Sequence, residues 1–222
     1  MGIRKNKVMK VQIRPAGKED IAFIAWVLLT AHRGHLERGL WDFMVGGDEQ
    51  QCLGYLQGLT STDQLHWAHF STFLVAEVDH QPAAALSGYF APQLGEEAFV
   101  KGLFEANRKI GRSKEEHKAS FQRYGSILHV APEHANGTWV VENVATRPEF
   151  RRRGLVDQLL AKILEKGRDL GARTTDISVL IGNDPAQCAY EKNGFQVAGE
   201  KRHPDFEKTY GTPGIRALSR EL

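Results

Sequence analysis

The chain has 222 residues and a mass of 24.8 kDa, with 41% hydrophobic and 25% charged residues. These proportions are typical of a globular protein and exclude a disordered, collagen-like or disulfide-scaffold chain. The formal net charge is only +2, from 29 Lys+Arg against 27 Asp+Glu, so we expect no nucleic-acid partner and no membrane-surface role.

Length and cysteine content set the expected organisation and location. A single domain over residues 8–222, with an insertion at 91–137, fits a chain of this size. Cys52 and Cys188 cannot build a disulfide framework, which indicates a reducing compartment and predicts a cytoplasmic protein. The longest apolar stretch, 21–31, is too short to span a bilayer, and the N-terminus lacks the apolar region of a secretory signal.

In the first half, two kinds of periodicity predict five elements. Val8–Arg14 alternates as a strand, and apolar residues then repeat at helical spacing over about 18–32. A second helix is expected near 48–59. The runs 72–78 and 82–90, joined by a short polar turn, predict an antiparallel hairpin.

The middle of the chain, residues 91–137, has less pattern. Residues 98–110 and 114–124 have the composition of helices, and a structureless loop of this length is unusual inside a compact domain. We therefore interpret this stretch as an insertion that carries one or two helices.

The second half has the clearest pattern. It predicts six elements in chain order: a strand at 138–146, a helix at 152–170, a strand at 174–181, a short helix from 183 to 194, and strands at 195–200 and 215–222 joined by a long polar loop. Strand–helix–strand order requires parallel pairing, whereas hairpins require antiparallel pairing. The predicted fold class is α/β, with a central mixed, mostly antiparallel sheet, helices on both faces and a helical insertion before the fourth strand.

The segment Thr146–Val156 lies between a predicted strand and a helix N-terminus. Backbone N–H groups in such a turn have no intrahelical partner, and the helix dipole adds positive potential, so the turn suits a pyrophosphate. Gly154 would allow close approach because it has no Cβ. Three consecutive arginines, Arg151, Arg152 and Arg153, would add fixed positive charge. The alternative is a basic helix start on a solvated face.

A second motif, Asn183–Phe195, begins about thirty residues later, at the end of the next predicted strand. Together the two motifs resemble the acetyl-coenzyme A signature of the GCN5-related N-acetyltransferase (GNAT) superfamily. The matching residues are Thr146, Pro148, Phe150, Arg151 and Gly154 in the first motif, and Asn183, Ala186, Tyr190, Lys192, Gly194 and Phe195 in the second. The family usually has Gly or Ala where this chain has Val156.

The resemblance implies a GNAT-type fold and an acetyl-CoA co-substrate, with no metal. In that fold, strands 140–146 and 174–181 would be parallel and would separate at their C-terminal ends. The cofactor-binding residues carried over are Val144, Ala145 and Thr146 on the first strand, Arg151, Arg152, Arg153, Gly154, Leu155 and Val156 at the helix start, and Asn183, Ala186 and Tyr190 in the second motif. The implied reaction is direct attack of an amine on the thioester in a ternary complex.

Two residues are candidates for proton transfer. Alternation places Glu142 on one face with Val144 and Thr146, and many family members have a catalytic glutamate there, so Glu142 is the candidate base. Tyr190 is the candidate acid for the leaving thiolate. The alternatives are an ion pair of Glu142 across the sheet, and an ordinary amphipathic aromatic role for Tyr190.

The acceptor is expected to be a primary amine of a small molecule or peptide, bound by residues 30–71, 91–137 and 201–214. Three other hypotheses stay open: a non-catalytic acyl-CoA-binding sensor, a donor with a longer acyl chain, and the homodimer that is common in similar proteins.

Several weaker signals remain. The pairs His32/His35 and His66/His69 have the spacing of metal ligands on a helix, but neither has a third ligand beside it, and surface or pocket histidines are the preferred interpretation. Three aromatic residues, Trp41, Phe43 and Trp67, either line a pocket or form a cluster under a loop. Cys188 is expected to be a small core residue.

Overall fold

The computed structural model describes residues 10–91 and 93–222. The first half contains β1 (Val11–Pro15), α1 (Ile21–Arg33), α2 (Leu40–Val45), α3 (Glu49–Thr60), β2 (Phe73–Val78) and β3 (Gln81–Phe90), with 3₁₀ turns η1 (Lys18–Asp20) and η2 (Phe70–Thr72). Val8 and Met9, where the first strand was predicted to begin, lie outside the described residues.

The β3–β4 segment, residues 91–138, contains α4 (Glu96–Lys109), α5 (Lys114–Tyr124) and η3 (Gly125–His129). The remaining elements are β4 (Trp139–Thr146), η4 (Pro148–Phe150), α6 (Leu155–Asp169), β5 (Thr174–Leu180), α7 (Asp184–Lys192), β6 (Gln196–Arg202), α8 (Pro204–Tyr210) and β7 (Gly214–Glu221). The helices predicted in the middle of the chain are thus confirmed.

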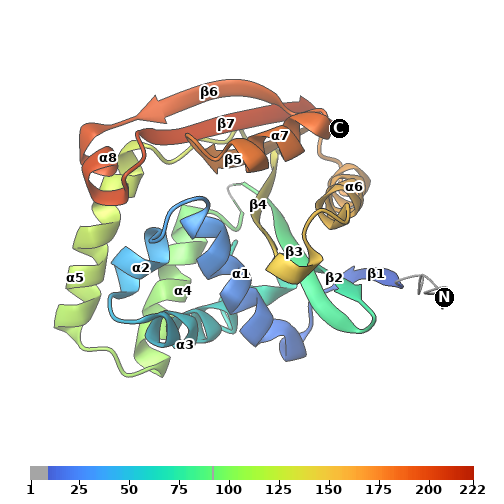
Figure 1. Cartoon of the computed structure of the whole chain (residues 1–222). Coiled ribbons are helices and arrows are strands. Elements are labelled where there is room, and N and C mark those ends of the chain that lie inside the picture. Colours follow the sequence, from blue (N-terminus) through green and yellow to red (C-terminus); the bar gives the residue numbers. More distant parts are fainter. Residues whose placement is uncertain (1–9, 92) are drawn as a thin grey trace, which may run out of the picture.

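The described strands form one mixed sheet in the order β1-β2-β3-β4-β5-β7-β6. Only β4 and β5 pair in parallel, and every other neighbouring pair is antiparallel. Figure 1 shows α6 on one face of the sheet and α1 to α4 on the other. The predicted fold class is therefore confirmed.

Each face of the sheet has its own apolar core. On one face, α1 and α3 pack with Phe73, Val75 and Ala85 of β2 and β3. On the other face, the apolar stripe of α6 packs against Leu86 and Trp139, among others, because side chains of a strand alternate between the two faces. The sheet is thus covered on both faces along its centre, which holds β4 rigidly between two helical layers.

The parallel strands β4 and β5 separate before they end. Their pairing is confined to Trp139↔Thr175, Val140↔Asp176 and Val141↔Ile177. Beyond this point β4 continues to Thr146 and β5 to Leu180 without pairing to each other. The predicted separation of the two C-terminal ends is confirmed, and it leaves the β5-facing edge of β4 unpaired beyond Val141, while its other edge stays paired with β3.

A β-bulge lies in β4 at the start of this gap. Glu142 is opposite Ser87, but Ala145 is opposite Ala85, so β4 has one residue more than β3 between these pairs. Asn143 takes up the extra length with a φ of +58°. The prediction that Glu142 shares a face with Val144 and Thr146 is therefore wrong: the bulge reverses the alternation, and Glu142 shares the α1 face with Ala145.

Two helices were not predicted. The segment expected as a long polar loop before β7 contains α8, which begins at Pro204 and buries Phe206 and Tyr210 on one face. The other is α2, whose six residues are too few to show a helical period. In both cases the helix is stabilised by packing of a few aromatic side chains against distant segments, which the local pattern does not reveal.

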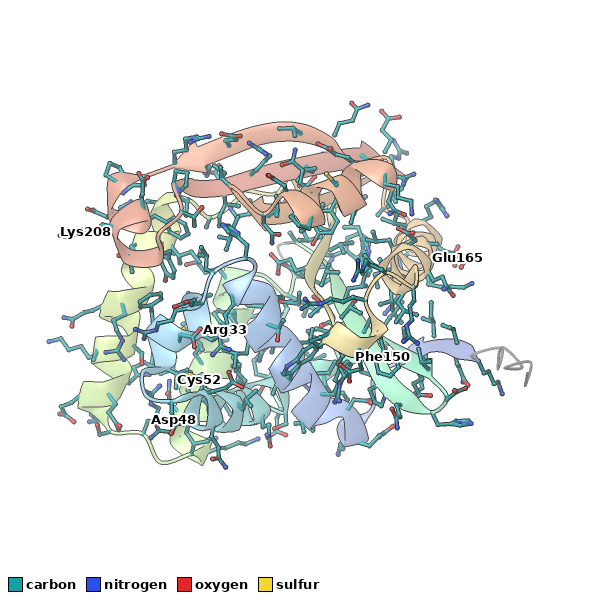
Figure 2. All side chains as sticks on the ribbon, in the orientation of Figure 1. Arg33, Asp48, Cys52, Phe150, Glu165 and Lys208 are labelled. Carbon is teal, nitrogen blue, oxygen red and sulfur yellow. The ribbon has the colours of Figure 1, made fainter. Side chains whose placement is uncertain are left out.

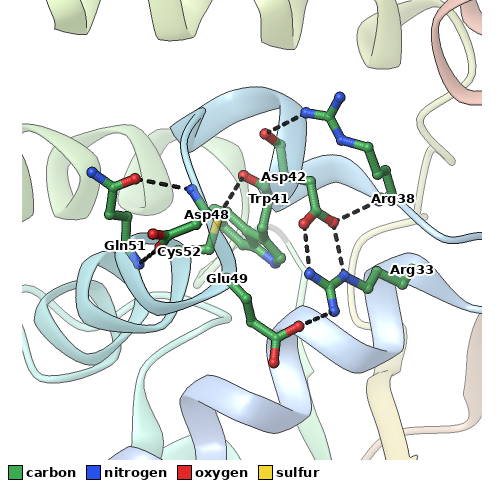
Figure 3. Close-up of polar contacts among 9 residues, drawn as sticks. Arg33, Arg38, Trp41, Asp42, Asp48, Glu49, Gln51 and Cys52 are labelled. Carbon is green, nitrogen blue, oxygen red and sulfur yellow. Dashed lines mark hydrogen bonds and ion pairs between the residues drawn. The ribbon is translucent and has the colours of Figure 1, made fainter.

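An ion-pair network joins α1, α2 and α3 (Figure 3). Arg33 donates to both carboxylate oxygens of Asp42, at 3.0 and 2.7 Å, and to Glu49 at 2.6 Å. The amide of Gly39 also donates to Asp42, at 2.8 Å. Burial opposes ionisation of Asp42, but these hydrogen bonds outweigh it and lower its pKa. The network fixes the turn between α1 and α2, which borders the cavity described next.

The described helices include none that is both long and apolar enough to cross a membrane.

Candidate active site

The turn between β4 and α6 has the backbone conformation of an anion site. Gly154, the N-cap of α6, is left-handed with φ +71°, and Arg152 also has a positive φ of +59°. The first intrahelical bond runs from the Gln158 amide to the Gly154 carbonyl, at 3.2 Å. The amides of Leu155 and Val156 therefore precede the hydrogen-bonded helix and point out of its positive end.

The arginine side chains are held around this turn. Arg151 Nε donates to the Thr146 carbonyl at 3.3 Å, and Arg153 Nη2 donates to the Glu149 carbonyl at 2.8 Å. Arg153 also lies over the ring of Phe150. Phe150, in this turn, is labelled in Figure 2. These exposed guanidinium groups place several positive charges beside the amides of the helix start.

A cavity of about 940 Å³ runs from this turn through the gap between β4 and β5. We call its two ends the α6 half, lined by the β4–α6 turn, α6 and α7, and the α1 half, lined by α1, the β3–β4 segment and α8. The predicted cofactor-binding residues all line it: Val144, Ala145, Thr146, Arg151, Arg152, Arg153, Gly154, Leu155, Val156, Asn183, Ala186 and Tyr190. The volume is near the upper end of ligand sites, enough for more than one small ligand.

Glu142 faces the α1 half of the cavity. Burial raises the pKa of its carboxyl above the ordinary value, against the opposing influence of His134 and of a hydrogen bond with Tyr89. A raised pKa makes a carboxylate a stronger base, and the hydrogen bond holds the group in place. Glu142 therefore has the environment of a proton acceptor, and within the described residues its side chain makes no ion pair across the sheet.

Tyr190 lines the same cavity from α7. Its side chain is 6% exposed, and burial raises the pKa of the phenol above its usual range. The hydroxyl group is therefore protonated at neutral pH and available as a donor. The gap between the strands thus brings together Glu142 of β4 and Tyr190 of α7 around one cavity.

The β5–α7 turn closes against the α1–α2 turn. A Cβ at Gly34 would lie 3.1 Å from Asn183 Nδ2 and 3.2 Å from the Leu180 side chain, and Gly34 has a positive φ. Glycine is therefore required for close approach at this point. The contact places Asn183 where α1 and α7 meet beside the cavity.

Four residues near Glu142 were not predicted. Tyr89 hydrogen-bonds to Glu142, and Asn143 donates to Ser87 Oγ at 2.9 Å within the bulge. His134, in the β3–β4 segment, hydrogen-bonds to Asp176 of β5 at 2.9 Å. Tyr89, Asn143 and His134 line the cavity, whereas Asp176 reaches it only through His134. The strand residues depend on the register of β3, β4 and β5, and His134 lies in a loop with no periodicity, so no local signal identifies any of the four.

The weaker signals resolve into structural roles and two corrections. His66 was predicted to be a surface or pocket histidine but is fully buried outside the cavity, where it contacts Thr62 at 3.0 Å. His32 is half-buried and lines the cavity, and Trp41 Nε1 donates to its Nδ1 at 3.1 Å. Trp41 is in the core, whereas Trp67 lines the cavity. Cys188 was predicted to be a core residue and is exposed instead, because it lies on the outer face of α7.

One cluster of potential metal ligands outside the cavity was not predicted. His129, His203 and Asp205 have ligand atoms within 4.8 Å of one another. The two imidazole rings are stacked face to face, with centroids 4.0 Å apart and planes inclined by only 14°. An ion lies near the plane of an imidazole that binds it, and two stacked planes do not meet at one ion, so this geometry is that of a ring contact.

Comparisons with known proteins agree with this geometry. The sequence model of the Acetyltransferase (GNAT) family matches residues 36–195. A Bacillus subtilis protein assigned as ribosomal protein bS18-alanine N-acetyltransferase is 32% identical over 73 residues, which are 30% of this chain and 48% of that protein. Mycothiol acetyltransferase of Corynebacterium glutamicum is 37% identical over 81 residues, 36% of this chain and 27% of that protein. The matches thus span half or less of these relatives.

Solved structures share the fold at low sequence identity. An N-acetyltransferase from Staphylococcus aureus Mu50 has a TM-score of 0.64 and 22% identity, covering 94% of this chain and 100% of that chain. PaiA N-acetyltransferase of Thermoplasma acidophilum, solved with coenzyme A, has a TM-score of 0.52 and 11% identity, covering 96% of this chain and 100% of that chain. Since the family model covers most of the chain and the fold agrees, this chain belongs to the Acetyltransferase (GNAT) family.

Proposed function

We propose that this protein is an acetyl-CoA-dependent N-acetyltransferase that transfers the acetyl group to a primary amine of a small molecule or peptide. The observation that carries the proposal is the cavity, which joins the turn before α6 to Glu142 and Tyr190 through the gap between β4 and β5. Mycothiol acetyltransferase and the bS18-alanine N-acetyltransferase support an amine acceptor of either size.

The residues of the α6 half fit coenzyme A. The amides before the first bond of α6 and the three arginines would hold a diphosphate, and Gly154 leaves its approach open, since a Cβ there has no neighbour closer than 4.0 Å. The unpaired end of β4 would hydrogen-bond an extended pantetheine arm beside Asn183 and Ala186. When bound, acetyl-CoA supplies the acetyl thioester.

The protein's own groups then act on protons and charge. Glu142 would accept a proton from the incoming ammonium group, so that a neutral amine can attack the thioester carbon. A backbone amide of Val144 or Ala145 would stabilise the negative charge that develops on the carbonyl oxygen. Tyr190 would donate its phenolic proton to the leaving thiolate and regain a proton from the nitrogen as the intermediate collapses, which gives an amide and free coenzyme A.

The test combines binding and turnover. We expect calorimetry to show acetyl-CoA binding, and a thiol reagent to detect coenzyme A release that depends on an added amine, with mass spectrometry identifying the acetylated product. Tight binding without turnover of any amine would instead favour a non-catalytic acyl-CoA-binding module. Preferential binding of a longer acyl-CoA would replace the acetyl donor. The cytoplasmic location stays a prediction from the sequence, which cell fractionation can check.

A further inference from the structure

The two halves of the cavity differ in charge. Four basic side chains, Arg151, Arg152, Arg153 and Lys192, line the α6 half beside the carboxylate of Asp157. Within the described residues, the α1 half has no lysine or arginine in its lining; its acidic groups are Glu96 and Glu142, and its histidines are His32, His35 and His134. His32, also in this lining, is neutral at pH 7, because burial lowers its pKa to about 4. The α1 half therefore favours a cation and disfavours a carboxylate.

The rest of the α1 half is apolar. Aromatic and aliphatic side chains from six different elements or loops line it: Leu40, Trp67, Phe99, Ile127, Leu128, Phe206, Tyr210 and Ile215. Leu128, on η3, lines the cavity and is 49% exposed although it is apolar. Such a lining recognises an apolar body by burial and offers few polar partners to a peptide backbone.

The β3–β4 segment borders this half of the cavity and is tied to other elements at two places in its second half. At the first, Arg123 Nε donates to the Phe43 carbonyl at 2.6 Å, which ties α5 to α2. At the other, Lys201 Nζ donates to the Ala131 carbonyl at 3.0 Å and pairs with Glu133 at 2.7 Å. Figure 1 shows α5 at the edge of the molecule alongside α2, with α8 near its upper end. These ties hold one wall of the pocket in place.

From these three features we propose that the acceptor is a small apolar primary amine that has no carboxylate. The proposal rests on the N-acetyltransferase function above and specifies its substrate class. The ammonium group would lie beside Glu142, and the apolar body would fill the space under Leu128. An amino acid, a polyamine or a peptide N-terminus would each lose contacts or add an uncompensated charge.

The test is a panel of four amines at fixed acetyl-CoA: phenethylamine, phenylalanine, spermidine and an alanine-initiated tripeptide. Phenethylamine and phenylalanine differ by the carboxylate alone. We expect phenethylamine to have the highest kcat/KM, by about tenfold or more over phenylalanine, which corresponds to one unfavourable charge contact at short range. A higher kcat/KM for any of the other three would overturn the acceptor class. No turnover of all four, with acetyl-CoA bound, would instead contradict the proposed acetyl transfer itself.

A pair of variants tests the role of the pocket lining. Leu128→Lys places a cation in the α1 half, and we expect the preference for phenethylamine over phenylalanine to fall at least about fivefold. Leu170→Lys is the matched control, because Leu170 is 57% exposed at the end of α6 and does not line the cavity. An unchanged preference in Leu128→Lys, with acetyl-CoA affinity intact, would show that the acceptor does not bind beside Leu128.

A second inference rests on a different contact, the 2.9 Å bond between His134 Nδ1 and Asp176 Oδ2. The nitrogen of an ammonium acceptor loses two protons on the way to an amide, and the thiolate takes one of them. The other must reach solvent. His134 lines the cavity and is close enough to Glu142 to act on it electrostatically, and its side chain is 12% exposed.

We infer that His134 is a positioning residue that passes the proton of Glu142 to solvent, with Asp176 holding the imidazole. With Nδ1–H donating to Asp176, Nε2 is left as the acceptor, and the carboxylate stabilises the imidazolium that forms. No bond other than N–H and O–H bonds changes in this step. The ionisable groups around His134 are Asp176 on β5, Glu142 on β4 and Tyr89, which contacts Glu142 from β3.

The test uses His134→Gly and added imidazole, which can occupy the vacated space. We expect kcat to fall about tenfold or more, with an unchanged KM for acetyl-CoA. Added imidazole should restore part of the lost kcat, in proportion to the concentration of unprotonated imidazole. Asp176→Asn should lower kcat less. Wild-type kcat in His134→Gly would overturn the relay, and so would a loss that imidazole leaves unchanged, because that result indicates a structural role.

Discussion

The α6 half and the α1 half of the cavity are built in opposite ways. In the α6 half, the predicted contacts to the coenzyme are mainly backbone amides and consecutive arginines of one short turn. In the α1 half, side chains from α1, β3, the β3–β4 segment and α8 converge from distant parts of the chain. A binding site made by one local turn can be reused with different partners, whereas a pocket made by distant side chains is specific to one protein. The difference explains why the donor is easier to infer than the acceptor.

The largest expected effect is a loss of acetyl-CoA affinity from a change in the α6 half alone. In Gly154→Asp, a carboxylate replaces hydrogen at the anion site, on a backbone with φ +71°, so we expect the Kd for acetyl-CoA to rise about 100-fold or more. Gly171→Asp is the control, because Gly171 also has a positive φ (+92°) with open space around it and lies at the far end of α6. Calorimetry on both variants checks this. Retained affinity in Gly154→Asp would mean that the diphosphate binds elsewhere.

Glu142→Gln separates chemistry from binding. We expect kcat/KM to fall by about 10²–10⁴ while the Kd for acetyl-CoA stays the same. In the wild type, activity should be lost as pH falls through the raised pKa of Glu142, above the ordinary value of 4.5, because the base becomes protonated. Steady-state kinetics against pH measures both. A profile without this acidic limb would remove Glu142 from the role of base.

The same variant should also change stability. A carboxyl whose pKa is raised in the folded protein costs stability above its unfolded pKa, where the unfolded chain ionises more readily. Glu142→Gln should therefore unfold at higher urea concentration than the wild type at pH 7, and the difference should vanish near pH 4. Equal midpoints at pH 7 would contradict the burial of this carboxyl.

Tyr190→Phe should have a smaller effect in the same direction. The ring keeps its packing in the core with Phe195, and only the proton donor is lost. We expect kcat to fall about 10- to 100-fold with little change in acetyl-CoA affinity. The deficit should shrink with a donor whose thiolate is a better leaving group. Wild-type turnover would exclude Tyr190 as the acid.

Asp42→Asn would weaken the α1 half and leave the α6 half intact. The Asp42 side chain is 9% exposed and accepts hydrogen bonds from Arg33 and from the Gly39 amide. Removing its charge should therefore lower the free energy of unfolding by about 3 kcal/mol. The control Glu97→Gln removes a solvent-exposed pair with Lys101 and should leave the urea midpoint nearly unchanged, because solvent screens exposed pairs. Urea unfolding measures both. The Kd for acetyl-CoA of folded Asp42→Asn should be unchanged, and a large rise would show that the two halves are coupled.

Local sequence determined the α6 half and most of the elements. Periodicity and helix start and stop signals predicted α1, α3 to α7 and the strands, because most of these elements present an apolar stripe to the core. The turn at Arg151–Gly154 was predictable for a related reason: its glycine and its position ahead of a helix specify the direction of the amides without reference to the rest of the chain.

Tertiary structure alone decided the α1 half. Three features illustrate this. The bulge at Asn143 turned Glu142 to the α1 face, the packing of Phe206 and Tyr210 formed α8, and the fold brought His134 to Asp176, 42 positions away in the chain. Each depends on contacts between segments far apart in sequence, whose energies exceed the weak local preferences of the residues involved. No periodicity or motif encodes such contacts, so the acceptor pocket emerges only when the chain is folded.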